Sequence, residues 1–205
     1  AINLRIPHTG VAMRRIRSYA LREFRVCNRR LWRDRLGQIS LAVTTLFWGV
    51  SGNLKYIVLA WAALVLSYST AQATSLLGVV AIGTAIGATW ASFKSRLDEA
   101  HKVIPLGVLM GVLVILMNGL YFMPREPLDV RLWLSWGFLL VLGGVGGYLV
   151  VPMNALLQHR GHQLMGAGRS IAVQNFNEQA CILLLGGLYV GMQWLGWSAA
   201  VSIIS

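Results

Sequence analysis

Five polar residues lie within six positions of a segment that is otherwise apolar: Gln174, Asn175, Asn177, Glu178 and Gln179. Polar groups are costly in hydrocarbon, so those of a membrane helix usually face a bundle interior or a wet cavity. Gln174 and Glu178 are four residues apart, as are Asn175 and Gln179, which predicts two adjacent rows on one broad helix face. Asn177 lies off that face. Such amides and carboxylates can bind the polar part of a transported molecule, or they can join helices to one another.

Lys55 is a second candidate for a functional residue, because it is the only basic residue inside a predicted apolar block. A lysine at the centre of a membrane helix costs about 2.5–3.5 kcal/mol, so its ammonium group needs water or a partner. It can extend towards the outer surface, pair with Glu178 (the only acidic residue inside a predicted span), or face a cavity and meet an anionic substrate. Nearby Asn53 favours a wet face. We predict that a transport route includes Asn53, Lys55, Asn154, Gln174, Asn175 and Glu178.

Asn154 follows Pro152 at the end of an apolar segment, where proline leaves a backbone carbonyl free and can kink a helix. Arg160 and Arg169 follow in a basic stretch, and they either set the membrane topology or bind phosphate headgroups. His159 and His162 lie near no cysteine or carboxylate, so we predict no metal site.

Enzymatic chemistry has no support in the residue pattern. Ser170 has no histidine and carboxylate pattern nearby, and no glycine loop of the phosphate-binding type precedes a helix. We therefore expect a membrane transporter without a cofactor, not an enzyme.

The composition indicates that these residues belong to an integral membrane protein. Hydrophobic residues make up 56% of the 205 positions and charged residues 12%, whereas a soluble domain is usually about 25% charged. The apolar residues form long blocks, which is typical of membrane-spanning helices. The predicted spans cover residues 41–66, 75–93, 103–123, 132–152, 170–194 and, in part, 196–205.

The basic residues indicate the orientation of these spans. Ten of the eighteen Lys and Arg residues fall within residues 1–40, three within 94–102 and two within 154–169, which are alternate predicted loops. Cytoplasmic loops carry the excess of basic residues, so we expect a cytoplasmic N-terminal arm and no nucleic-acid partner. Within the arm, Phe24, Cys27 and Leu31 recur at helical spacing, which predicts a basic amphipathic helix on the membrane surface. A solvated linker helix is the alternative.

Glycines four residues apart occur in four of the predicted spans, at 83/87, 107/111, 143/147 and 187/191. Such faces let membrane helices approach one another closely, so a compact bundle is expected.

Two segments, VPMNALLQHRG at 151–161 and GAGRSIAVQNFNE at 166–178, resemble the lysophospholipid transporter family of Gram-negative inner membranes. FWG at 47–49 and LKY at 54–56 look like the opening span of the second half of that family. The resemblance implies a major-facilitator fold of twelve spans in two six-helix halves around a central cavity. This chain would be the C-terminal half, preceded by its cytoplasmic linker and with the last helix truncated, and it would need the N-terminal half to transport.

The resemblance also implies a function as a flippase. Lysophosphatidylethanolamine and similar lysolipids would move from the outer to the inner leaflet of the inner membrane. An acyltransferase/acyl carrier protein synthetase would be the partner that reacylates them. The alternatives are a proton-coupled exporter of a drug or another small solute, with Glu178 as its proton site, and a non-transporting membrane anchor for an enzyme.

Overall fold

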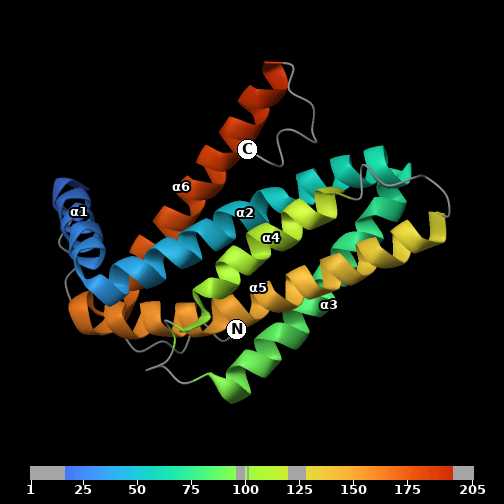
Figure 1. The fold of residues 1–205 in the computed structure, drawn as a ribbon. Helices are drawn as coiled ribbons and strands as arrows, with labels where there is room; N and C mark the ends of the chain where they lie inside the picture. Colours follow the sequence, from blue (N-terminus) through green and yellow to red (C-terminus); the bar gives the residue numbers. More distant parts are fainter. Residues whose placement is uncertain (1–16, 96–99, 101, 120–127, 196–205) are drawn as a thin grey trace, which may run out of the picture.

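The computed structural model describes residues 17–95, 100, 102–119 and 128–195, and these form an all-helical bundle (Figure 1). No strand occurs among them. The helices are α1 (Arg17–Arg33), α2 (Arg35–Leu66), α3 (Thr70–Lys94), α4 (Pro105–Gly119), α5 (Leu128–Met165) and α6 (Ala167–Trp194). They confirm the all-α class expected from the sequence. The sixth predicted span, residues 196–205, lies outside the described residues.

Local sequence signals fix where several helices begin and end. The carboxylate of Asp34 caps α2 by accepting a hydrogen bond from the Gly37 amide at 2.9 Å. Ser69 and Gln72 form a reciprocal capping box at the start of α3. Gly166, with φ of +86°, separates α5 from α6, and glycine is the residue that adopts this left-handed conformation without steric cost.

The predicted basic loop at 154–169 is wrong, because α5 continues as a helix through Met165 and α6 begins at Ala167. Pro152 lies inside α5 and does not end it. The polar residues that suggested a loop, among them Arg160 and Gln163, are good helix formers. The turn shrinks to Gly166, and the end of α5 extends beyond the expected membrane span.

The closest helix pair is α3 with α5, and glycines make the approach possible. A Cβ atom on Gly83 or Gly87 would overlap the carbonyl oxygens of Leu140 or Gly144, and one on Gly143 or Gly147 would overlap those of Val80 or Thr84. Two of the four predicted glycine pairs thus form one reciprocal interface. In contrast, Cβ atoms on Gly111, Gly187 and Gly191 would meet nothing within 4 Å, so these glycines have no such role within the described residues.

The helix α1 packs across the end of the bundle where α5 meets α6 (Figure 1). The expected amphipathic helix is present, but its apolar side is covered by protein. Cys27 and Leu31 lie in one buried cluster with Leu157 of α5 and Val173 of α6. The boundary predicted at residue 40 also falls inside α2, which begins at Arg35.

The outside of the bundle is apolar over much of its length. Exposed large side chains include Ile82, Ile86 and Trp90 on α3 and Leu183, Leu184 and Leu188 on α6. Contiguous apolar surface of this kind is typical of contact with lipid or with another protein. Among the described helices, Ala71–Lys94 and Val130–Met165 are long and apolar enough to cross a membrane, and Pro105–Met117 is apolar but shorter. Crossing by α2 and α6, which carry the predicted polar site, stays a prediction.

Candidate functional site

Three of the predicted route residues form one hydrogen-bonded chain between α5 and α6. The amide nitrogen of Gln174 donates to Asn154 Oδ1 at 2.9 Å and to Glu178 Oε1 at 2.8 Å. Gln174 and Glu178 are only 8% and 9% exposed. Surface polar residues are not usually buried in this way. We call the three hydrogen-bonded side chains, Asn154, Gln174 and Glu178, the α5–α6 polar chain, and they form the centre of the candidate site.

A close helix crossing positions the α5–α6 polar chain. A Cβ atom on Gly161 of α5 would overlap the hydroxyl oxygen of Ser170, so only glycine lets the start of α6 lie this near. Leu157 and Val173 then pack together in the buried cluster beneath α1. One turn of helix before Leu157 lies Asn154, and it faces Gln174 across the same crossing.

Asn53 joins α2 to α6 farther along the bundle. Its side-chain amide donates to the carbonyl oxygens of Gly49 at 2.9 Å and of Ile182 at 3.2 Å. Gly49 and Gly52 lie against Cys181 and Ile182, which places the two helices side by side and in the same direction. The described contacts of Asn53 are therefore those of a polar link between helices.

Lys55 does not pair with Glu178 in this structure. Its side chain is exposed, and its ammonium nitrogen lies 4.8 Å from the centre of the Tyr56 ring. Because Asn53 lies opposite Ile182 and Gly186, Lys55 is at least two helical turns beyond the level of Glu178, on the order of 10 Å. A path that passes both residues in succession stays a prediction.

The polar residues of α6 divide between different surroundings instead of sharing one broad face. Asn175 and Gln179 are exposed, whereas Gln174 and Glu178 are buried. Asn177 links α6 to α1, because it donates to Asn28 Oδ1 at 3.0 Å and accepts from the indole of Trp32 at 3.3 Å.

Arg160 is held by Asp34, which also caps α2. Its Nε donates to Asp34 Oδ2 at 3.0 Å, and its Nη2 bonds the other carboxylate oxygen. The hydrogen bonds from Arg160 lower the pKa of Asp34, against the raising effect of burial. Arg160 therefore ties α5 to the junction of α1 and α2, a role beyond the two predicted for it, topology and headgroup binding.

Arg169 likewise pairs with Glu23 of α1. Sequence reasoning missed both acidic partners, Asp34 and Glu23. A signal for Asp34 was available, because an aspartate ahead of an apolar helix is a common N-cap. No such signal exists for Glu23, since its partner is 146 positions away in the chain.

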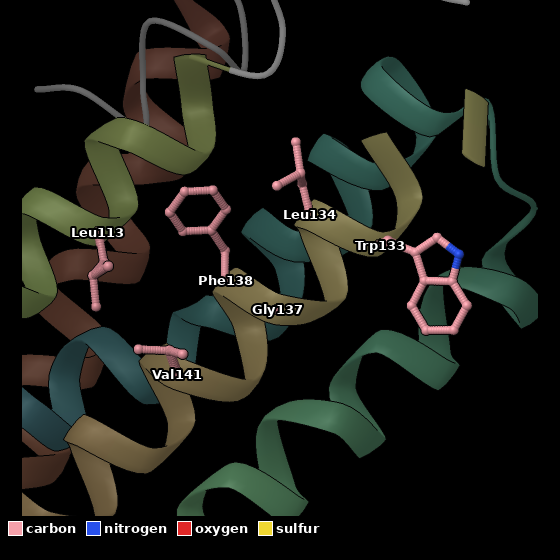
Figure 2. Close-up of a pocket in the computed structure, with 6 residues that line it drawn as sticks. All are labelled: Leu113, Trp133, Leu134, Gly137, Phe138 and Val141. Atoms are coloured by element: carbon pink, nitrogen blue, oxygen red, sulfur yellow. The ribbon is translucent and has the colours of Figure 1, made fainter. Parts of the chain in front are cut away.

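An apolar hollow of about 260 Å³ lies between α4 and α5, towards the start of α5. It is lined by Leu113, Trp133, Leu134, Gly137, Phe138 and Val141, and Figure 2 shows Phe138 projecting from α5 towards the helix that carries Leu113. Its lining has no charged group. It suits a hydrocarbon chain better than a polar headgroup.

Several known proteins that carry the same name are similar to this chain. The chain is 38% identical over 176 residues to the protein named lysophospholipid transporter LplT of Pectobacterium carotovorum. The aligned region covers 85% of this chain and 41% of that protein. Proteins of the same name from Serratia proteamaculans and Escherichia coli are 39% and 37% identical over 160 residues, or 78% of this chain and 38% of theirs. Over the aligned region, this chain is similar to the lysophospholipid transporter family.

The chain spans about two fifths of the length of the curated relatives that it matches. No family model and no solved structure matches it. The family resemblance predicted from residues 151–161 and 166–178 is confirmed. These two segments also hold the α5–α6 polar chain and Arg160 and Arg169, which pair with Asp34 and Glu23.

Proposed function

We propose that this chain forms one half of a lysophospholipid transporter, whose polar route passes the α5–α6 polar chain. The observation that carries the proposal is the buried carboxylate of Glu178, bonded to the buried Gln174 on the same helix. The names of the relatives support the substrate class. The burial supports a functional role, because ionisable groups at such positions usually belong to substrate or ion pathways.

The chemistry of a lysolipid matches the groups available. Its headgroup carries a phosphate and, in lysophosphatidylethanolamine, an ammonium group. Glu178 would bind the ammonium, and Gln174 and Asn154 would hydrogen-bond the rest of the headgroup. Lys55 would meet the phosphate nearer the outer surface. The single acyl chain would stay against apolar helix faces, and the hollow lined by Phe138 offers one.

We further propose transport from the outer to the inner leaflet of the bacterial inner membrane, with the N-terminal arm in the cytoplasm. The N-terminal half of the transporter would complete the cavity, since rocking of two halves gives alternating access. An acyltransferase/acyl carrier protein synthetase would be the partner that reacylates the lipid. These points rest on the family resemblance and on the excess of basic residues at 1–40, 94–102 and 154–169.

Uptake of radiolabelled lysophosphatidylethanolamine tests the function, using the complete transporter in spheroplasts that lack their own. Glu178→Gln keeps the size of the side chain and removes its charge, so uptake should fall roughly 10- to 100-fold, the range of a hydrogen bond to a charged group. Lys55→Ala should also reduce uptake. Gln179→Ala is the matched control, because it removes an exposed polar group from the next position of α6 and should leave uptake unchanged.

Each competing function predicts a different outcome. Normal uptake by both Glu178→Gln and Lys55→Ala would remove these residues from the route. Uptake that collapses with the proton gradient would favour the proton-coupled exporter. Absence of uptake by the unaltered complete protein, with the partner enzyme still held at the membrane after Gln174 and Glu178 are both replaced by leucine, would favour the membrane anchor.

A further inference from the structure

Helix α1 has two sides that differ in chemistry. Phe24, Cys27 and Leu31 face the bundle, where Phe24 also meets Phe176 edge to face at a ring distance of 5.0 Å. On the opposite side of the helix lie Arg22, Arg29 and Arg33, all exposed. They follow the spacing of seven and four residues that brings side chains to one helix face.

No acidic residue of α1 neutralises this outward side. Glu23 forms an ion pair with Arg169 of α6. Asp34, directly after the helix, forms an ion pair with Arg160 of α5. Arg30 is also directed to the bundle, where it donates to the carbonyl oxygen of Leu164 at 3.0 Å. The acids of this region are therefore used to fasten α1, and a surplus of positive charge remains on its outer face.

The contacts of α1 also fix its position relative to α5 and α6. The helix lies across the ends of α5 and α6 (Figure 1), beside the turn at Gly166. If α5 and α6 cross the bilayer, α1 lies at the level of the headgroups. Two exposed apolar side chains of α1 lie near the arginines: Leu21 is 74% exposed and Val26 54%.

We propose that the outward face of α1, made by Arg22, Arg29 and Arg33, binds anionic phospholipid of the surrounding bilayer. The exposed Leu21 and Val26 favour a lipid surface over an acidic soluble protein, because they can enter the boundary between headgroups and acyl chains. The basic side chains bind the phosphates. This proposal depends on the membrane position of the bundle and does not depend on what the transporter carries.

The proposal differs from the sequence expectation in the face that meets the lipid. The amphipathic pattern alone assigns the membrane to the apolar side of α1, but Cys27 and Leu31 on that side are buried in the protein. The lipid contact therefore belongs to the basic side and its edges. Anionic lipid bound there would strengthen the attachment of α1 to α5 and α6.

The test is the affinity of the purified complete transporter, in neutral detergent, for dioctanoyl phosphatidylglycerol, measured by titration calorimetry. Dioctanoyl phosphatidylcholine reports the binding that needs no net headgroup charge. Each basic residue near an anionic surface contributes roughly a factor of five in affinity, so Arg22→Gln, Arg29→Gln and Arg33→Gln together should weaken phosphatidylglycerol binding by the order of 100-fold. Added salt should weaken binding to the unaltered protein.

The matched control replaces Arg5, Arg14 and Arg15 by Gln, which removes the same charge from the same arm. It should keep most of the affinity. Equal losses in the two triple variants would contradict a defined site and indicate only the net charge, and an unchanged affinity in the α1 variant would overturn the proposal in favour of an acidic protein partner. Replacing the same three arginines by Lys should retain binding, which separates loss of charge from misfolding of α1.

Discussion

At the scale of single residues, Glu178 is the group that a purely structural helix explains least well. Within the described residues its one hydrogen bond comes from Gln174, at 2.8 Å, whereas a carboxylate can accept about four. A group with unused acceptors in a buried place suits a ligand that brings its own donors, such as an ammonium group. Gln174 serves as the positioning residue, because its amide also binds Asn154 on the neighbouring helix.

Asp34 and Arg160 give a residue-scale prediction about pH. Because Arg160 lowers the pKa of Asp34 in the folded protein, Asp34 holds its charge more firmly when folded than when unfolded. The stabilisation is therefore complete above the unfolded pKa, about 3.9, and is lost as pH falls through the lower folded pKa. Asp34→Asn should remove this pH dependence and cost about 1 kcal/mol near neutral pH, while Asn preserves the helix cap.

The measurement is the free energy of unfolding in mild detergent between pH 3 and pH 7. Arg160→Gln should give the same loss as Asp34→Asn, and the double variant should lose no more than either single one. Additive losses would mean that the two side chains act separately, contrary to the contact between them.

The site could be foreseen from the sequence only in part. The cluster of polar residues on α6 pointed to Gln174 and Glu178, because such residues are expensive in an apolar segment. Periodicity alone placed Asn175 with them, although it is exposed, since helical spacing does not show which neighbour covers a row. Asp34 could be recognised as a helix cap, but its pairing with Arg160 and the pairing of Glu23 with Arg169 depend on contacts between distant segments, which no local pattern encodes.

At the scale of helices, the interface of α3 with α5 should be the most sensitive to added volume. Gly87→Ala would place a Cβ atom against the carbonyl oxygen of Gly144, which is backbone and has little freedom to move. Overpacking of this kind costs about 1–3 kcal/mol, so the variant should unfold at a lower denaturant concentration than the unaltered protein.

Gly78→Ala is the control for that prediction, because it lies on the same helix and a Cβ atom there meets nothing within 4 Å. It should be neutral or stabilising by up to about 1 kcal/mol, since alanine is the better helix former. Equal stability of the two variants would mean that the glycines are not in close contact with α5.

The sequence predicted the helices better than it predicted their ends. Apolar blocks identified the segments that form α2 to α6, because their composition alone requires burial or lipid. The loop predicted at 154–169 is wrong because charged and polar residues do not by themselves indicate a loop: Arg, Gln and His are compatible with a helix outside the membrane. Gly166 is the residue that interrupts the helix there. It lies in the motif at 166–178, but it gives no distinctive signal, because glycine is common throughout the sequence.

At the scale of the whole molecule, one end of the described bundle is joined by ion pairs and a buried cluster, whereas α6 has exposed apolar side chains farther along. Near the Gly166 turn, Asp34 joins the start of α2 to α5, and Glu23 joins α1 to α6. Leu31 of α1 packs there in the buried cluster with Leu157 and Val173. Farther along α6, the side chains of Leu183, Leu184 and Leu188 are exposed. If a second half completes the transporter, it would move relative to this bundle, in which α1 contacts α2, α5 and α6 near the Gly166 turn.

The most direct test of the α5–α6 polar chain is protection of Asn154 by substrate. In the complete transporter, Cys27 and Cys181 are first replaced by Ala and Asn154 by Cys, and the rate of alkylation by a water-soluble maleimide is measured in membranes. Lysophosphatidylethanolamine should slow this alkylation several-fold, while diacyl phosphatidylethanolamine should not. Alkylation at the same rate with and without the lysolipid, in a variant that still transports, would contradict a headgroup route past Asn154, Gln174 and Glu178.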